Sequence, residues 1–253
     1  RGTEMKQNIW MGLMGGLVAL FSVVAFAEPA ADYAREKKWA DEVVPGLVVG
    51  DPVYLQTPRG HHKFLALFTP VEGDKAVVVV HGMGIHPDWG MVGTLRTELA
   101  DRGFATLSIQ MPVLAADAQG AAYLPTFPEA AERIAQAVDF LKAKGYTQLA
   151  IVSHSMGSRM SRAYFSGQPD AAVKAWASLG LQQDDYAGLK LPVLDMYGDN
   201  DLPPVLTDAA KRKGSLAAGH SKQVVIPHAD HFYTGHEGEM VETVASFLND
   251  TLK

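Results

Sequence analysis

The chain has 253 residues, of which 47% are hydrophobic and 20% charged, as in an ordinary globular domain. Its net charge of −6, without a basic stripe of interleaved aromatic residues, argues against a nucleic-acid partner. Because the sequence contains no cysteine, it excludes a disulfide framework, a thiol nucleophile and a thiolate metal site.

The N-terminal segment has the pattern of a secretory signal peptide. Residues 1–4 precede Met5, the expected start, and an uncharged run over residues 9–26 leads to Ala25-Phe26-Ala27, which is typical of a cleavage site. We therefore expect residues 1–27 to be removed and residues 28–253 to form a single domain, periplasmic or secreted, without stable membrane insertion. The alternative is an uncleaved inner-membrane anchor, because about 18 apolar residues can just span a bilayer.

The first part of the domain reads as an antiparallel hairpin. Residues 28–44 suggest a helix or a loose lead-in, residues 47–55 a first strand and residues 62–69 a second, with turn residues at 57–60. The β-branched run at residues 77–80 is expected of a strand that is buried on both faces of a parallel sheet.

Beyond residue 80, helices and strands alternate. The pattern predicts helices at residues 92–102, 128–144, 158–165, 205–216 and 239–252, and strands at 104–109, 148–152, 173–179, 193–197 and 223–226. This alternation predicts an α/β fold: a mostly parallel central sheet with helices on both faces, fronted by the N-terminal hairpin. Only about a dozen residues separate the strands at 173–179 and 193–197, so no cap domain fits there.

Ser155 lies between a predicted strand and a predicted helix, where a nucleophile elbow would place it. The G-x-S-x-G pattern requires small residues on either side; Gly157 fits it, and Ser153 replaces the first glycine. Such a turn lifts the serine oxygen above the sheet at a helix N-terminus, whose free N–H groups favour an oxyanion. We expect the elbow to turn His154 away. The alternative is that Ser153 or Ser155 only caps the helix.

A glycine-containing loop follows the valine-rich strand, at the sheet edge where ligands bind in such folds. Gly82 and Gly84 let backbone N–H groups approach a bound atom closely. We expect the N–H groups of Met83 and Met156 to form an oxyanion hole. On its own, the loop could equally be a flexible turn.

The pocket next to this loop is predicted to be open and mostly apolar. His86 and Trp89 should lie on its rim, although capping and core packing explain them equally well. The irregular stretch 111–127, which contains Tyr123, should drape over the same edge and form part of an acyl pocket for short to medium chains.

His231 follows the last predicted strand, where the fold would return a base to the serine; His228 is the competitor. The acid must lie beyond the end of its strand in order to turn back toward the base. Asp195 lies inside the strand, which leaves Asp199 and Asp201. Since the two histidines lie in a loop without an H-E-x-x-H helix, we expect neither a metal nor a cofactor.

The order of Ser155, an acid and His231, with His-Gly-x-Gly upstream, resembles that of the α/β-hydrolase superfamily over nearly all of the mature chain. The elbow Ser-His-Ser-Met-Gly is similar to the Gly-His-Ser-Met-Gly of many lipases and esterases. More narrowly, the stretches 82–89, 105–112 and 192–195 resemble a bacterial family of secreted α/β-hydrolase-fold proteins without assigned function.

This resemblance implies a serine carboxylic-ester hydrolase (EC 3.1.1.-) that acts on a small-molecule ester through an acyl-enzyme intermediate. Ser155 would be the nucleophile and His231 the general base. Asp201 fits the G-x-x-D pattern with a downstream proline that many members show, and Asp199 is the alternative. Some members of the superfamily are catalytically silent, so the second hypothesis is a non-catalytic envelope protein that binds or scaffolds with the same fold.

Overall fold

The computed structural model describes residue 2, residues 31–59 and residues 61–253. The predicted signal peptide therefore falls almost wholly outside the described residues. Within the described part of the chain, no helix is both long enough and apolar enough to cross a membrane.

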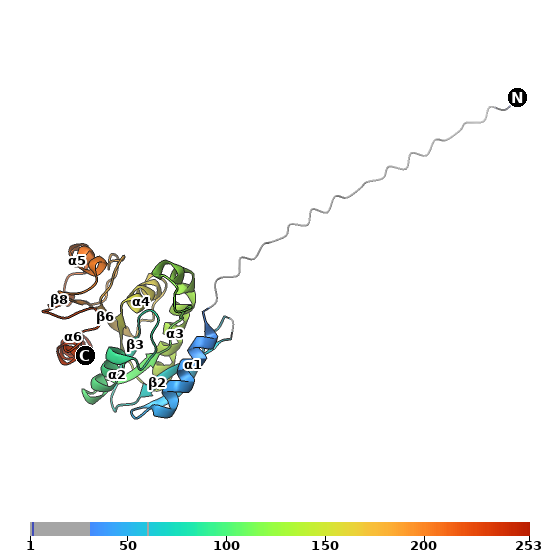
Figure 1. The fold of residues 1–253 in the computed structure, drawn as a ribbon, viewed down its shortest axis with the longest axis horizontal. Helices are drawn as coiled ribbons and strands as arrows, with labels where there is room; N and C mark the ends of the chain where they lie inside the picture. The colour runs from blue at the N-terminus through green and yellow to red at the C-terminus, as the bar shows by residue number, and fades with distance from the viewer. Residues whose placement is uncertain (1, 3–30, 60) are drawn as a thin grey trace.

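The strands of this part form one eight-stranded sheet in the order β1-β2-β4-β3-β5-β6-β7-β8 (Figure 1). Strand β2 pairs antiparallel with both β1 and β4, and all the other pairs are parallel. The predicted mostly parallel sheet with an antiparallel N-terminal hairpin is thus confirmed. Strands β1 and β8 are the two edges. The strands are β1 (Asp51–Gln56), β2 (Lys63–Thr69), β3 (Lys75–Val80), β4 (Ala105–Ile109), β5 (Gln148–His154), β6 (Val173–Leu179), β7 (Val193–Gly198) and β8 (Lys222–Ile226).

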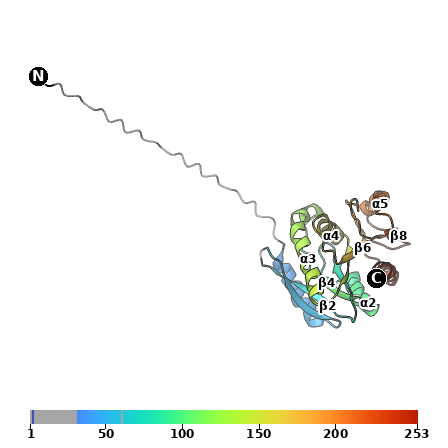
Figure 2. The same ribbon diagram turned by 180° about the vertical axis from the view of Figure 1, so that it is seen from behind.

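Helices cover both faces of the sheet, as Figures 1 and 2 show from opposite sides. Side chains of α3 and α4 pack into the core on one face, and side chains of α2 and α6 pack into the core on the other. The helices are α1 (Tyr33–Val43), α2 (Gly90–Asp101), α3 (Phe127–Ala143), α4 (Met156–Ser166), α5 (Pro203–Ser215) and α6 (Glu237–Thr251), with 3-10 turns η1 (Val44–Gly46) and η2 (Gly120–Thr126).

The central strand β3 shows why its sequence is continuously apolar. Val77 and Val79 face the core beneath α2 and α6, whereas Val78 and Val80 face the core beneath α3 and α4. A strand with polar residues on alternate positions would bury them against one of the two helix layers. The β-branched run therefore fixes β3 in the interior, and the loop that follows it emerges at the carboxyl edge of the sheet.

The prediction of a strand over residues 47–55 was wrong in its first half. Strand β1 begins only at Asp51, and Val48 is 93% exposed. The reason is local: the proline-containing turn η1 precedes this stretch, and Gly50 has a φ of +78°, which interrupts an extended conformation. Val49 does not join the sheet. Its carbonyl accepts a hydrogen bond from the Arg96 guanidinium at 2.8 Å.

Candidate active site

Ser155 forms a strained turn between β5 and α4. Its φ of 56° and ψ of −121° lie in a region that side chains disfavour, at a cost of about 1–3 kcal/mol. The turn is held by its own N–H, which donates to the carbonyl of Leu179 at 2.8 Å. At Gly157, a Cβ would lie 2.3 Å from the carbonyl oxygen of His81, so only glycine lets α4 approach the end of β3 this closely. This is the strand–turn–helix geometry of a nucleophile elbow.

Ser153, which stands where the elbow pattern has glycine, is integrated into the core. Its hydroxyl accepts a hydrogen bond from the indole Nε1–H of Trp176 at 2.7 Å and lies 3.1 Å from the hydroxyl of Ser158. All three side chains are buried. The departure from glycine is therefore accommodated by a hydrogen bond that a glycine could not make.

Three buried side chains are hydrogen-bonded in series at the carboxyl edge of the sheet. His231 Nε2 lies 2.9 Å from Ser155 Oγ, and His231 Nδ1 lies 2.5 Å from Asp201 Oδ1. A carboxylate can only accept, so Nδ1 carries the proton and the Nε2 lone pair accepts from the serine hydroxyl. The arrangement can remove the Ser155 proton and stabilise the imidazolium that forms.

Asp201 is the one of the three acids around the end of β7 that reaches His231. Asp199 accepts a main-chain N–H from the loop after β8 at 2.6 Å, which is a turn-forming contact. Asp195 is fully buried inside β7 and forms an ion pair with Arg212 at 2.9 Å. His228, the competing base, is exposed and lies at a turn with a φ of 64°.

The ring of His81 fixes the conformation of the loop that was expected to supply an oxyanion donor. Complete burial lowers the pKa of His81 to about 3, so its ring is neutral. Its Nε2 accepts the N–H of Met111 at 2.9 Å, and its Nδ1–H therefore donates to the carbonyl of Gly82 at 2.7 Å. The Gly82 carbonyl and the Met83 N–H belong to one trans peptide and point in opposite directions. Holding the carbonyl thus fixes the direction of the N–H.

The two expected oxyanion donors are both available for a ligand. Met156 provides the first N–H of α4, and within the described residues neither its N–H nor that of Met83 donates a hydrogen bond. The loop also touches the serine: a Cβ on Gly82 would lie 3.2 Å from the Cβ of Ser155.

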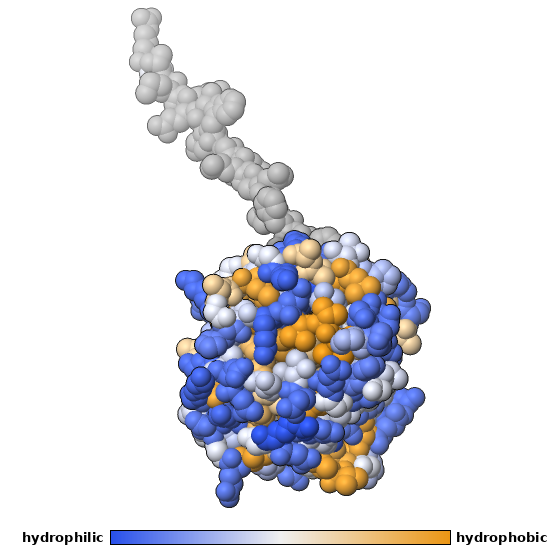
Figure 3. All heavy atoms as spheres, turned by 90° about the vertical axis from the view of Figure 1, so that its left-hand side faces the viewer, coloured by the Kyte–Doolittle hydropathy of each residue, from blue (hydrophilic) through white to orange (hydrophobic). Residues whose placement is uncertain are grey.

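A cavity of about 180 Å³ opens at Ser155. None of its wall residues is an acid, a lysine or an arginine, and three of them are exposed apolar side chains at the mouth: Met83, Leu202 and Phe232. Figure 3 shows hydrophobic patches among the hydrophilic surface on the side of the molecule that carries α5, β8 and α6. The wall comprises Gly82, Met83, Ile85, His154, Ser155, Gln182, Leu202, His231 and Phe232.

Of the residues expected around the substrate, the structure places Gly82 in this wall but not Gly84, His86, Trp89 or Tyr123. Tyr123 is 1% exposed and packs in the core beneath α3 and α4. Its hydroxyl accepts the N–H of Leu114 at 3.1 Å and so holds the loop after β4.

Trp89 and His86, which were expected on the rim, do not line the cavity. Trp89 packs edge-on against Phe232, with ring centroids 5.1 Å apart, and so supports a wall residue from behind. His86 accepts the N–H of Asp88 at 3.3 Å and faces the ring of Trp39 on α1. Their capping and packing roles therefore explain both side chains.

The expectation that His154 turns away from the site was wrong. Its ring lines the cavity, 4.7 Å from the ring of His231, and its Nε2 lies 2.8 Å from the main-chain carbonyl of His231. Sequence reasoning also missed Gly180, at which a Cβ would lie 3.1 Å from His231 Nδ1. A glycine directly after a strand at the ligand-binding edge was the available signal. The wall residues Ile85, Gln182, Leu202 and Phe232 carried no such signal.

In the part of the chain that the structure describes, no group of three or more histidine, aspartate and glutamate side chains is placed to hold a metal ion.

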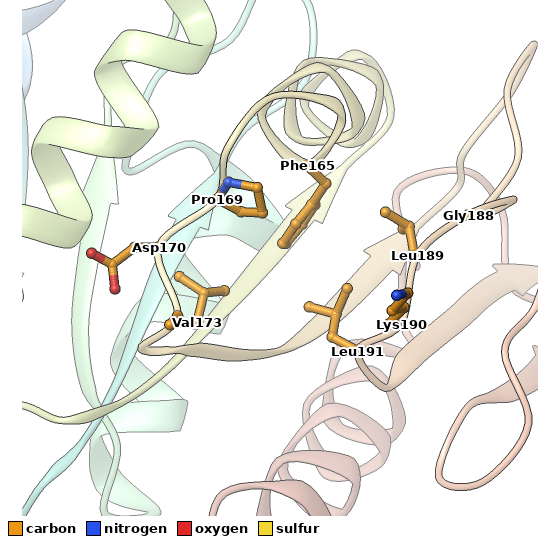
Figure 4. A pocket seen from close by; sticks show the side chains of 9 residues that line it. Phe165, Pro169, Asp170, Val173, Gly188, Leu189, Lys190 and Leu191 are labelled. Carbon is orange, nitrogen blue, oxygen red and sulfur yellow. The ribbon is translucent and has the colours of Figure 1, made fainter.

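A second cavity, of about 290 Å³, lies near the amino-terminal ends of β6 and β7, at the opposite ends of the strands from Ser155 (Figure 4). Phe165, Val173, Leu189 and Leu191 give it apolar walls. Asp170 points away from it and pairs with Lys142 at 2.5 Å. It offers a ligand no converging polar groups.

Solved structures of α/β-hydrolases superpose on most of the chain. A cold-adapted esterase from an Arctic intertidal metagenomic library matches with a TM-score of 0.67 and 18% identity, over 80% of this chain and 93% of that one. The dienelactone hydrolase from Anabaena variabilis matches with a TM-score of 0.65 and 19% identity, over 80% and 99%. The chain has the α/β-hydrolase fold. Est1E from Butyrivibrio proteoclasticus is similar as well, with a TM-score of 0.59 and 19% identity, over 79% and 98%.

A comparison with sequence families matches a smaller part of the chain. A family described as "Protein of unknown function (DUF3530)" matches residues 54–131, from β1 to the start of α3. This segment includes the loop after β3, which carries Gly82 and Met83, and ends before Ser155. No curated protein matches the sequence.

Proposed function

We propose that the protein is a serine hydrolase that cleaves carboxylic esters. The observation that carries this proposal is the series Ser155–His231–Asp201, in which a strained serine, an imidazole and a buried carboxylate are aligned within hydrogen-bond distance. The cold-adapted esterase among the structurally similar proteins supports it.

Each residue has one task in the proposed reaction. His231 Nε2 takes the hydroxyl proton as Ser155 Oγ bonds to the acyl carbon, and the carbonyl oxygen becomes an oxyanion. His231 then gives the proton to the leaving oxygen, which departs as an alcohol and leaves an acyl-serine. Water attacks this ester with His231 as base, and the acid is released with Ser155 regenerated. Asp201 keeps Nδ1 protonated throughout and stabilises the imidazolium.

The N–H groups of Met83 and Met156 are the proposed oxyanion donors. The hydrogen bond from His81 to the Gly82 carbonyl orients one of them before a substrate binds, so no reorganisation is required during the reaction. A donor of this kind contributes about 10²- to 10³-fold in kcat.

The cavity favours small neutral esters. Its volume of about 180 Å³ and its largely apolar wall, which contains no acid, lysine or arginine, suit a short chain and disfavour an ionised one, which would lose hydration without gaining a partner of opposite charge. The walls come from the end of β5 and from the loops after β3, β6, β7 and β8; the loop after β3 was expected to take part, whereas the loop after β4, which was expected to form part of the pocket, does not. We therefore keep the proposed preference for short to medium acyl chains, with Ile85, Gln182, Leu202 and Phe232 in place of Tyr123 in the wall.

Covalent labelling with a fluorophosphonate probe tests the proposal, because labelling requires both an activated serine and its base. The wild type and a Ser246→Ala control, altered at an exposed position of α6, should be labelled and should hydrolyse p-nitrophenyl butanoate. The Ser155→Ala variant should lose labelling and at least about 10³-fold in turnover. Near-normal hydrolysis by that variant would contradict the proposal. A folded wild type that neither reacts with the probe nor hydrolyses any ester would favour a binding or scaffold role.

We further propose that the protein acts in the periplasm or outside the cell. The support is the apolar run followed by Ala25-Phe26-Ala27 and then Glu28-Pro29. N-terminal sequencing of the exported protein should begin at about residue 28; a sequence that begins before Ala25 would indicate an uncleaved anchor instead.

A further inference from the structure

Gln182 is the one side-chain amide in the wall of the cavity at Ser155, next to apolar side chains such as Leu202 and Phe232. Across residues 31–59 and 61–253, no group forms a hydrogen bond with this amide, whereas the backbone N–H of its neighbour Gln183 donates to Asp208 Oδ2 at 2.8 Å. An amide placed in an apolar wall with its donor and acceptor unused is able to bind a polar group of a ligand.

The backbone holds Gln182 in place from both sides. Before it, Gly180 has a φ of +60° and donates its N–H to the carbonyl of Met196 at 2.8 Å. After it, Gln183 has a φ of +56°, which is unfavourable for a side chain with a Cβ, and is fixed by the bond to Asp208. Strain of this kind persists only where the surrounding structure imposes it, and it is concentrated at ligand-binding sites.

The position of Gln182 also indicates which part of an ester it meets. His231 Nε2 must reach both Ser155 Oγ and the leaving oxygen, so the alcohol part of the substrate lies on the imidazole side of the site. The loop that carries Gln182 packs on this side, since a Cβ at Gly180 would lie 3.1 Å from His231 Nδ1. Gln182 and His231 line the same cavity, so an ester whose alcohol part lies against the imidazole brings that part to the wall that contains Gln182.

We propose that Gln182 is a specificity-determining residue that hydrogen-bonds to a hydroxyl or carbonyl oxygen in the alcohol part of the ester. This inference rests on the proposed function and extends it: the preferred substrates are short esters of an alcohol that itself carries a hydrogen-bonding oxygen, such as a diol or hydroxy-ketone monoester. The apolar side chains Leu202 and Phe232 enclose the carbon chain around that oxygen.

Pairs of esters that differ by a methyl group and a hydroxyl group of similar size test the inference. The alcohol pair is propyl butanoate and 2-hydroxyethyl butanoate; the acyl pair is methyl butanoate and methyl 3-hydroxypropanoate. The kcat/KM of each is measured by pH-stat titration for the wild type, for Gln182→Met and for the control Gln168→Met, whose exposed glutamine lies far from the cavity, beyond the end of α4. Because the two esters of a pair differ in intrinsic reactivity, the measured quantity is the change in their ratio between proteins.

In Gln182→Met, the kcat/KM ratio of 2-hydroxyethyl butanoate to propyl butanoate should fall about tenfold, because only the hydroxyl ester loses a hydrogen bond. Gln168→Met should match the wild type, and the acyl pair should keep its ratio in all three proteins. An unchanged alcohol ratio in Gln182→Met, or a fall in the acyl ratio instead, overturns the inference. Fluorophosphonate labelling is followed in parallel: normal labelling with an unchanged ratio overturns this inference alone, whereas a wild type that is not labelled overturns the proposed function as well.

Discussion

The ring of His154 donates its Nε2–H to the main-chain carbonyl of His231 at 2.8 Å. The proton must sit on Nε2, because a carbonyl oxygen can only accept. Burial, with a smaller contribution from the nearby His231, lowers the pKa of His154 to about 3 and keeps the ring neutral. The residue before Ser155 thus holds the backbone of the residue that would serve as its base, which joins the elbow to the loop after β8.

The neutral state of His154 makes folding sensitive to acid. An unfolded histidine has a pKa near 6.5, so between pH 6.5 and pH 3 the unfolded chain binds a proton that the native state excludes. The free energy of unfolding should therefore fall as the pH falls through this range, by up to about 1.4 kcal/mol per pH unit for each such histidine. His81 contributes in the same direction.

Urea unfolding between pH 4 and 8 measures how steeply the free energy of unfolding depends on pH. His154→Gln should have a shallower slope than the wild type, whereas His220→Gln, at an exposed site, should not; equal slopes in all three would show that His154 is not the titrating group.

Loss of the carboxylate at Asp201 should disable turnover with little effect on binding. In Asp201→Asn, the imidazole of His231 is no longer held in the required tautomer, so kcat should fall by about 10²- to 10⁴-fold while KM changes little. Asp199→Asn is the matched control, because its amide oxygen can still accept the N–H of His228. Initial rates on p-nitrophenyl butanoate distinguish the two. Near-wild-type activity in Asp201→Asn together with collapse in Asp199→Asn would reverse the assignment of the acid.

Restoring the usual glycine of the elbow should weaken the fold. Ser153→Gly leaves the buried Nε1–H of Trp176 without its acceptor, which costs about 1–3 kcal/mol of unfolding free energy. Denaturant unfolding measures this cost, and Trp176→Phe provides the matched background in which there is no N–H to satisfy. Ser153→Gly should cost clearly less in that background. The same cost in both backgrounds would mean that the hydrogen bond contributes nothing.

Gly157 should not tolerate even one additional carbon. A Cβ there would lie 2.3 Å from the carbonyl oxygen of His81, a backbone atom that cannot rotate away, so Gly157→Ala should lower the free energy of unfolding by about 3 kcal/mol or more. Gly238→Ala serves as the control within α6, where a Cβ meets nothing within 4 Å; it should stabilise the protein by about 0.5–1 kcal/mol. Thermal or urea unfolding compares the two. Equal stability in the two variants would contradict the close packing of α4 on β3.

The architecture could be predicted from the sequence because buried positions are apolar and recur with the period of a helix or a strand. Val77 to Val80 are all apolar because helices cover both faces of β3. In the amphipathic helices, the buried apolar residues recur at helical spacing. Ser155 could be proposed as a nucleophile because the elbow needs small residues at fixed positions. The direction of the His154 ring depends instead on a loop 77 residues away, and no local pattern records it.

The walls of the cavity could not be predicted for a related reason. Gln182, Leu202 and Phe232 belong to three separate loops, and each is an unremarkable residue within its own segment. What brings them together is the order of β6, β7 and β8 in the sheet and the strained turn that follows β6. Tyr123 illustrates the opposite error: an aromatic residue in a loop near the site suggested a pocket wall, but its hydroxyl holds its own loop instead.

Among the strands that the structure describes, β8 pairs with β7 alone, and His231 follows it in the chain. Separation of this edge strand would take His231 away from Ser155, while β2 to β6 would keep both of their neighbours. Local opening at an edge requires less free energy than unfolding of the whole domain. On gentle heating or at low denaturant, chemistry that depends on His231 is therefore lost while most of the secondary structure survives, and it returns only when β8 has paired with β7 again.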